Sequence, residues 1–268
     1  MAGPLIAVWS PKGGTGKTLI AAGLAMHLVR RSGKPTLLID MAAGSADVAP
    51  LLQASLRPSI LDYPAATCRT LSHPSGLHLL AGPARLADGP LVTAELAEAV
   101  LNRALAEGYL VVADLDSDLR DSTLITIEKA DAVLLVTTPD LLALYACRRF
   151  AQEAEQIGLS LTKFRLVINR ATARQEIADA EILDLTGLPL AGKVPSLPGL
   201  AAAVNRGMLT PTFRSNTDFA AALHRIADQL SFAGVPEPQS PLARVTSPLE
   251  TDRPVGLVQA VRRWWQSL

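Results

Sequence analysis

The stretch Leu5-Ile-Ala-Val-Trp-Ser-Pro-Lys-Gly-Gly-Thr-Gly-Lys-Thr18 runs from an aliphatic segment through a glycine-rich turn into a helical pattern. Glycines in such a turn let backbone N–H groups approach phosphate oxygens without a Cβ in the way. A helix that begins near Lys17 adds the partial positive charge of its N-terminus. Lys17 can bridge the β and γ phosphates of ATP, and the Thr18 hydroxyl is placed to bind Mg²⁺. The stretch therefore predicts a phosphate-binding loop.

Short aliphatic runs alternate with helical patterns along most of the 268 residues. Strands are predicted at 5–9, 36–39, 77–80, 110–113, 132–136, 164–168 and 188–191. Helices are predicted at about 17–31, 92–106, 141–157, 176–185, 198–206 and 216–231. This alternation implies right-handed crossovers, and near-continuous Val, Ile and Leu runs are typical of strands covered on both faces. We expect an α/β fold of the P-loop NTPase kind, with a mostly parallel twisted sheet flanked by helices on both faces.

Composition limits the other classes of site. Hydrophobic residues make up 49% of the chain and aromatic residues only 4%, which predicts an aliphatic core. The formal net charge is zero, so any binding of nucleic acid would need a local basic patch. Cys68 and Cys147 lie far apart in the sequence, and the four histidines show no metal-ligand spacing. A disulfide framework and a zinc site are therefore not expected.

The composition changes near the end of the chain. We expect a P-loop domain at 1–233, a flexible proline-rich linker at 234–254 and a short amphipathic helix at 255–268. On that helix an apolar arc of roughly 120° is predicted. It consists of Leu257, Val258, Val261, Trp264, Trp265 and Leu268. Such a helix can lie in a membrane interface, dock in a partner's groove or pack on its own domain.

The N-terminus lacks a signal-peptide pattern, and the longest apolar stretch, 19–29, falls short of the ~18 residues of a spanning helix. A cytoplasmic location is expected, and residues 255–268 could add peripheral attachment at the inner face of the cell membrane.

Two aspartates follow predicted strands. Asp40 comes directly after 36–39, and Asp114 comes directly after 110–113. The carboxyl ends of parallel strands are where open α/β sheets bind ligands. Asp114 is interpreted as the Walker B residue that holds Mg²⁺; a helix cap or a turn is the alternative reading of such an aspartate.

A second lysine, Lys12, stands early in the loop, while Pro11 occupies the place of the usual first glycine. The loop resembles the deviant Walker A loop, Lys-Gly-Gly-x-Gly-Lys-Thr, of the ParA/MinD family of dimerising ATPases. The resemblance implies an ATP-dependent homodimer in which Lys12 acts in trans and Lys17 in cis. It implies catalytic roles for Lys12, Lys17 and Asp40, and Mg²⁺ binding by Thr18, Asp40 and Asp114. It also implies nucleotide contacts from Lys12, Gly13, Gly14, Thr15, Gly16, Lys17, Thr18 and Leu19.

Later blocks extend the likeness to about residues 5–230. In the block ending at Asn169-Arg170, the resemblance implies that Asn169 contacts adenine, with Arg170 beside it. The block that contains Pro195 would line the base pocket. A strand-end cap and a simple turn are the alternatives for Asn169 and Pro195. Within the family, the segment 39–49 and the blocks 76–83 and 205–207 resemble most the CpaE/TadZ-like pilus-assembly branch.

One position breaks the family pattern. Ala42 stands where the resemblance places a second aspartate, which orients the water that attacks the γ-phosphate. Loss of such a group typically lowers the rate on the order of 10²–10⁴-fold. We therefore expect ATP binding and dimerisation with slow hydrolysis, although Asp47 or Asp116 could substitute. Leu19 also replaces a hydroxyl residue that is common in relatives.

Three functions remain open. The first is an ATP-switched dimer that positions or recruits machinery for pilus or secretion assembly, or for polar localisation. The second is a ParA-type partitioning ATPase that binds DNA non-specifically, with Arg170, Arg174, Arg206 and Arg214 as candidate contacts. The third, a metabolic P-loop enzyme, lacks paired thiol ligands in this sequence.

Overall fold

The computed structural model describes residues 3–172, 177–206 and 217–230, and all of these belong to one compact unit, Met1–Glu237. Eight strands form one sheet in the order β3-β4-β2-β5-β1-β6-β7-β8. The strands are β1 (Leu5–Trp9), β2 (Thr36–Asp40), β3 (Leu71–Ser72), β4 (His78–Leu80), β5 (Leu110–Asp114), β6 (Ala132–Thr137), β7 (Phe164–Ala171) and β8 (Leu190–Pro195). All neighbours pair in parallel except β3, which runs antiparallel to β4 at the edge. The expected mostly parallel sheet is confirmed.

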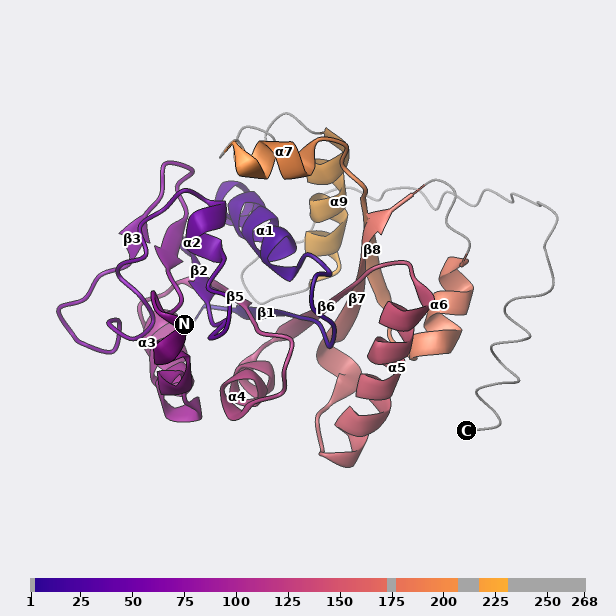
Figure 1. Cartoon of the computed structure of the whole chain (residues 1–268), viewed down its shortest axis with the longest axis horizontal. Helices are drawn as coiled ribbons and strands as arrows, with labels where there is room; N and C mark the ends of the chain where they lie inside the picture. The colour runs from indigo at the N-terminus through magenta and orange to yellow at the C-terminus, as the bar shows by residue number, and fades with distance from the viewer. Residues whose placement is uncertain (1–2, 173–176, 207–216, 231–268) are drawn as a thin grey trace. The chain divides into compact units, whose positions relative to one another are not determined.

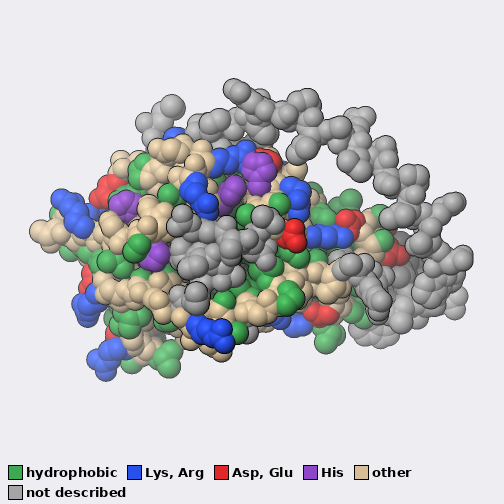
Figure 2. Space-filling view, turned by 90° about the horizontal axis from the view of Figure 1, so that it is seen from above, with side chains coloured by type: hydrophobic (Ala, Val, Ile, Leu, Met, Phe, Trp, Pro, Cys, Tyr) green, Lys and Arg blue, Asp and Glu red, His purple; other side chains and the backbone are tan. Residues whose placement is uncertain are grey.

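Helices cover both faces of the sheet. They are α1 (Lys17–Ser32), α2 (Val48–Leu51), α3 (Ala94–Ala106), α4 (Asp121–Lys129), α5 (Leu141–Gln156), α6 (Asp179–Thr186), α7 (Leu200–Asn205) and α9 (Thr217–Asp228), with 3₁₀ turns η1 (Leu86–Leu91) and η2 (Leu161–Lys163). Figure 1 shows α1 and α9 over one face, and α3, α4 and α5 over the other. Figure 2 looks down on the α1 and α9 side, where histidine and basic side chains gather.

Several predicted boundaries were wrong. The last strand begins at Leu190 instead of 188 and continues to Pro195. The helix predicted from 92 begins at Ala94, because Thr93 caps it by accepting the Leu96 N–H at 3.2 Å. The helix predicted from 176 begins at Asp179, and the one predicted at 198–206 is Leu200–Asn205.

Three elements, β3, α2 and α4, were not predicted. Helix α4 has the sequence Asp-Ser-Thr-Leu-Ile-Thr-Ile-Glu-Lys, in which β-branched residues lower the intrinsic helix propensity. Tertiary packing of α4 against α3 and β1 accounts for the helix. Strand β3 has only two residues, and α2 is a single turn, so neither produces a periodic pattern.

The core is aliphatic, as expected, and every residue of β1, β2 and β5 is buried. Because these parallel strands end at one edge of the sheet, they bring the loop after β1 close to Asp40 and Asp114. The predicted linker at 234–254 and terminal helix at 255–268 lie outside the described residues. Within the described ranges, no helix combines the length and apolar character that crossing a membrane requires.

Candidate functional site

The loop between β1 and α1 contains two glycines with left-handed backbone angles. Gly14 and Gly16 have φ angles of 76° and 92°, in the left-handed region that favours glycine. Gly16 is the N-cap of α1, and no side chain caps the helix there. The N–H groups of the first turn have no partners within the helix and offer a site for an anion.

The end of β7 braces this loop from the side. The Asn169 Nδ2 donates to the Thr15 carbonyl at 2.7 Å, and its Oδ1 accepts the Arg170 N–H at 2.9 Å. Arg170 has a left-handed φ of 58° and donates from Nη2 to the Gly14 carbonyl at 3.1 Å. Asn169 therefore fixes the phosphate loop, a contact that the sequence analysis missed. Its expected contact with adenine stays a prediction.

The two lysines of the loop point to different places. Lys17 Nζ donates to Ser117 Oγ at 2.7 Å, and its half-buried ammonium lies close to the charge of Asp114. Burial lowers the pKa of Lys17, although Asp114 and two further carboxylates oppose the effect. Lys12 Nζ instead lies 3.2 Å from Asp140 Oδ1, in a pair whose side chains are 41% and 50% exposed. Lys17 thus belongs to the interior of the site, and Lys12 belongs to its surface.

Asp114 carries a fully buried carboxylate close to the Thr18 hydroxyl and the Lys17 ammonium. The residue is fully buried, and neither oxygen makes a hydrogen bond of ordinary geometry with the described residues. Burial raises the pKa of Asp114, while the nearby Thr18 hydroxyl and the Lys17 charge oppose that rise. A buried carboxylate of this kind is unfavourable unless it is protonated or binds a cation.

The oxygen atoms of Asp114 and Thr18 are suitable ligands for Mg²⁺. Asp114 and the Thr18 hydroxyl are hard oxygen ligands, and Mg²⁺ at phosphate sites commonly uses one or two protein oxygens together with phosphates and water. Among the described side chains, no cluster of three or more His, Cys, Asp or Glu residues is arranged to hold a metal ion. A metal ion here would therefore need phosphate and water ligands as well.

Asp40 is adjacent to Asp114 in the β2–β5 register but has a different environment. Its Oδ1 accepts the Ala42 N–H and its Oδ2 accepts the Val48 N–H, both at 3.0 Å. Burial raises the pKa of Asp40, and the charge of Asp114 adds to this, against the two backbone hydrogen bonds. Through these two hydrogen bonds, Asp40 holds the backbone at both ends of the loop 41–47. Its metal-binding and catalytic roles stay predictions.

The loop 115–120 after β5 connects the parts of the site. Ser117 accepts the Lys17 hydrogen bond, and Asp116 Oδ2 accepts the Gly44 N–H at 3.1 Å. Arg120 pairs with Asp118 at 2.5 Å and lies 4.0 Å from Asp116. The loop therefore contacts both the phosphate loop and the loop after β2. The contact of Ser117 with Lys17 was not predicted, because serine in an acidic loop carries no distinctive pattern.

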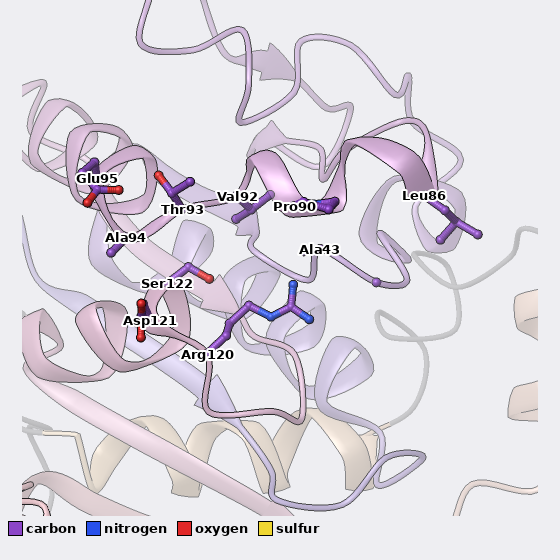
Figure 3. Close-up of a pocket in the computed structure, with 12 residues that line it drawn as sticks. Ala43, Leu86, Pro90, Val92, Thr93, Ala94, Glu95, Arg120, Asp121 and Ser122 are labelled. Carbon is purple, nitrogen blue, oxygen red and sulfur yellow. The ribbon is translucent and has the colours of Figure 1, made fainter.

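A cavity of about 700 Å³ adjoins these loops. Figure 3 shows Arg120 extending into it from the start of α4, toward Ala43 and Pro90. Thr93 and Glu95, at the start of α3, line another side. Because Ala43 and Arg120 belong to the two loops that reach the phosphate site, a movement of those loops would change this cavity.

The remaining predicted residues lie elsewhere. Leu19 is partly buried and packs against the hydrophobic core. Pro195 lines a separate cavity of about 330 Å³ with Thr172, Lys193 and Arg225. Its predicted contact with a base is therefore not part of the cluster around Lys17 and Asp114, and it stays a prediction.

Known proteins resemble this chain over most of its length. Residues 6–210 match the CobQ/CobB/MinD/ParA nucleotide binding domain. An uncharacterised protein of Mycobacterium tuberculosis is 29% identical over 243 residues, which cover 87% of this chain and 65% of that protein. This chain thus spans less than two thirds of that relative. The septum site-determining protein MinD of Synechocystis is 28% identical over 76% of this chain and 80% of its own length.

Solved structures share the fold. A ParA family ATPase from Chlorobium tepidum has a TM-score of 0.72 at 20% identity, covering 83% of this chain and 97% of that one. MinD from Pyrococcus horikoshii, solved with Mg-ADP, has a TM-score of 0.70 at 19% identity, covering 84% and 95%. The family match covers well over half of the sequence and includes the phosphate loop, Asp40, Asp114 and the end of β7. This chain belongs to the CobQ/CobB/MinD/ParA nucleotide-binding domain family.

Proposed function

We propose that this protein is an ATP-switched ATPase, which dimerises when it binds ATP with Mg²⁺ and hydrolyses the nucleotide slowly. The arrangement of the two lysines carries the proposal. Lys17 is directed into the site at Ser117, whereas Lys12 of the same loop lies at the surface beside Asp140. A surface lysine on a phosphate loop can stabilise phosphate charge in a second subunit only when two loaded subunits meet.

The phosphates would be bound by the N–H groups of the loop 12–18 and by Lys17, once Lys17 leaves Ser117. Mg²⁺ would be held by Asp114 and Thr18, and when bound it neutralises charge on the phosphate oxygens. The open acceptors of Asp114 support this assignment. The chain itself orients the phosphates through the loop, which Asn169 and Arg170 brace.

Slow turnover follows from Ala42. This residue is buried and has no side-chain acceptor for an attacking water, and Asp40 uses both its oxygens on backbone N–H groups. We expect turnover below roughly 1 s⁻¹, at the low end of enzyme rates.

In the cell, the ATP-bound dimer would position or recruit machinery for pilus or secretion assembly or for polar localisation, as the CpaE/TadZ-like pattern suggests. Recruitment of a partner protein has a parallel in the fold, since a solved MinC:MinD complex from Aquifex aeolicus has a TM-score of 0.71. Residues 255–268 would attach the dimer peripherally to a membrane. Two copies raise avidity by about 10²–10⁴ when both engage.

The first test is light scattering after size exclusion. Wild type, Lys12→Ala and Lys17→Ala would each be run without nucleotide, with ADP–Mg²⁺ and with ATP–Mg²⁺. We expect a dimer only for wild type with ATP. Lys12→Ala should bind a fluorescent ATP analogue but stay monomeric, and Lys17→Ala should lose binding. A mass that does not respond to nucleotide would contradict the switch.

Two further assays separate the cellular roles. Binding of the ATP-bound dimer to anionic vesicles, lost on deletion of 255–268, would support membrane attachment. Salt-sensitive binding to random duplex DNA would favour the partitioning role instead.

A further inference from the structure

We propose that Asp116 supplies the carboxylate that position 42 lacks and orients the water that hydrolyses ATP. This inference rests on the proposed function, and it assigns the slow hydrolysis to a residue of the adjacent loop. The carboxylate would come from the loop after β5 instead of the loop after β2.

The first support is position. The Asp116 Oδ2 accepts the N–H of Gly44, two residues beyond Ala42, so the carboxylate lies against the loop where relatives are expected to carry their aspartate. A Cβ placed on Gly44 would be 3.8 Å from both carboxylate oxygens. The Asp116 carboxylate is therefore within ordinary van der Waals range of this loop.

The second support is the connection to the phosphate-binding groups. Asp116 lies near enough to Lys17 and Asp114 for its charge to act on both. The next residue, Ser117, holds Lys17 Nζ directly at 2.7 Å. When Lys17 moves to the phosphates, the loop that carries Asp116 loses this tie and is free to adjust to the nucleotide.

The third support is an available acceptor. Asp116 is 18% exposed, and within the described part of the chain only Oδ2 makes a hydrogen bond, with Arg120 Nη2 4.0 Å from the same oxygen. Oδ1 is left to accept a hydrogen bond from water. Asp118 on the same loop is 47% exposed and pairs with Arg120, and Asp47 is exposed at the start of α2.

The chemical step balances without another reactant. A water held by Asp116 Oδ1 forms a bond from its oxygen to the γ-phosphorus. The bond between the γ-phosphorus and the bridging oxygen breaks, and ADP keeps the electron pair. The proton of the water passes to a γ-phosphate oxygen, which gives inorganic phosphate. Asp116 orients the water throughout.

The test measures single-turnover hydrolysis of radiolabelled ATP, affinity for a fluorescent ATP analogue, and dimer mass by light scattering. Asp116→Asn keeps an oxygen for the Gly44 N–H. We expect it to bind ATP and dimerise like wild type but to hydrolyse at least about tenfold more slowly, so that the ATP-bound dimer persists. The matched control Asp118→Asn should keep the wild-type rate. Adding Ala42→Asp to Asp116→Asn should restore hydrolysis.

The outcomes distinguish this inference from the function on which it rests. If Asp116→Asn hydrolyses as fast as wild type, or if wild type binds ATP and dimerises without any hydrolysis, Asp116 has no such role and the dimer switch stands. If wild type does not bind ATP, the proposed function itself fails. Should Asp116→Asn not fold, Ala42→Asp alone decides. A rise below about tenfold supports Asp116, and a larger rise contradicts it.

Discussion

Lys12 Nζ lies 3.2 Å from Asp140 Oδ1, which ties the surface lysine of the phosphate loop to the start of α5 in the same chain. Asp140 is well held for this contact. Its Oδ1 accepts the Ala143 N–H at 3.0 Å, and its Oδ2 accepts the Thr138 hydroxyl at 2.5 Å. Burial raises the pKa of Asp140, but these hydrogen bonds and the Lys12 charge outweigh it and leave the pKa below its ordinary value. The pair thus holds the exposed Lys12 ammonium against its own chain.

Asp140→Asn tests whether this pair opposes dimerisation. Asparagine is an equally good helix cap, so α5 should be unaffected while the charge on Lys12 is released. Exposed ion pairs contribute at most about 1 kcal/mol each, and a homodimer contains two of these pairs, so ATP-dependent dimerisation should tighten by no more than about thirtyfold. Analytical ultracentrifugation with ATP–Mg²⁺ would measure the dissociation constant. Weaker dimerisation by Asp140→Asn would mean that Asp140 acts in the dimer instead.

Asp114→Asn should have opposite effects with and without ligand. Burial raises the pKa of the Asp114 carboxyl to about 7, compared with about 4 in the unfolded chain. Between these pH values the folded chain binds more protons than the unfolded chain, so wild-type stability falls as pH rises from about 4 to about 7. We expect the neutral variant to be more stable by on the order of 1 kcal/mol near neutral pH, and the gain to vanish in acid.

With ATP–Mg²⁺ present, the same variant should lose the stabilisation that wild type gains, which is about 2.7 kcal/mol at a ligand concentration of 100 times Kd. Thermal melts with and without ATP–Mg²⁺ would measure both effects, with Asp118→Asn as the control. A full Mg²⁺-dependent shift in Asp114→Asn would exclude Asp114 as the ligand.

Gly16→Ala and Gly13→Ala should differ although both lie in the phosphate loop. A Cβ at Gly16 would be 2.3 Å from Asn169 Nδ2, and the φ of 92° disfavours any side chain. A Cβ at Gly13 meets nothing within 4 Å. In urea unfolding without nucleotide, we expect a loss of about 1–3 kcal/mol for Gly16→Ala and less than about 0.5 kcal/mol for Gly13→Ala.

A double-mutant cycle with Asn169→Ala identifies the cause. If the collision with Asn169 dominates, Gly16→Ala should cost less stability in the Asn169→Ala background than in wild type. Equal costs in the two backgrounds would assign the loss to the backbone conformation alone.

The central strands and the phosphate loop could be predicted from the sequence because continuous aliphatic runs and a glycine-rich turn are local patterns. The proximity of Asp40 and Asp114 also followed, since both end parallel strands. Helix α4 was missed because packing against α3, not propensity, maintains it.

The hydrogen bonds that connect the parts of the site could not be predicted in the same way. Asn169 reaches Thr15 and Ser117 reaches Lys17 because β1 lies between β5 and β6, with β7 next along the sheet. That strand order is a property of the whole fold, and no spacing of residues along the chain encodes it.

His27 provides a pH-dependent test of the packing between α1 and α9. Its ring is 5.6 Å from that of His224, and its buried Nε2 has no hydrogen-bond partner among the described residues. Burial, and then the charges of His224, Arg31 and Arg30, lower the pKa of His27 to about 4, with Asp228 opposing them. In the unfolded chain the pKa is about 6.5. Between these values the unfolded chain binds more protons, so stability rises with pH and is lost as pH falls from about 6.5 toward 4.

His27→Gln should remove this part of the pH dependence. Because the ring is only half-buried and solvent screens part of the effect, we expect wild type to lose about 1–2 kcal/mol relative to the variant between about pH 6.5 and 4. Urea unfolding of both proteins across this range gives the difference in unfolding free energy. Asp40 and Asp114, whose raised pKa values make stability fall with rising pH, contribute equally to both proteins and cancel in this difference. Above about pH 7, where the imidazole is neutral in both states, the difference should be constant. Parallel curves across the whole range would show that His27 is protonated in the folded protein as readily as in the unfolded chain.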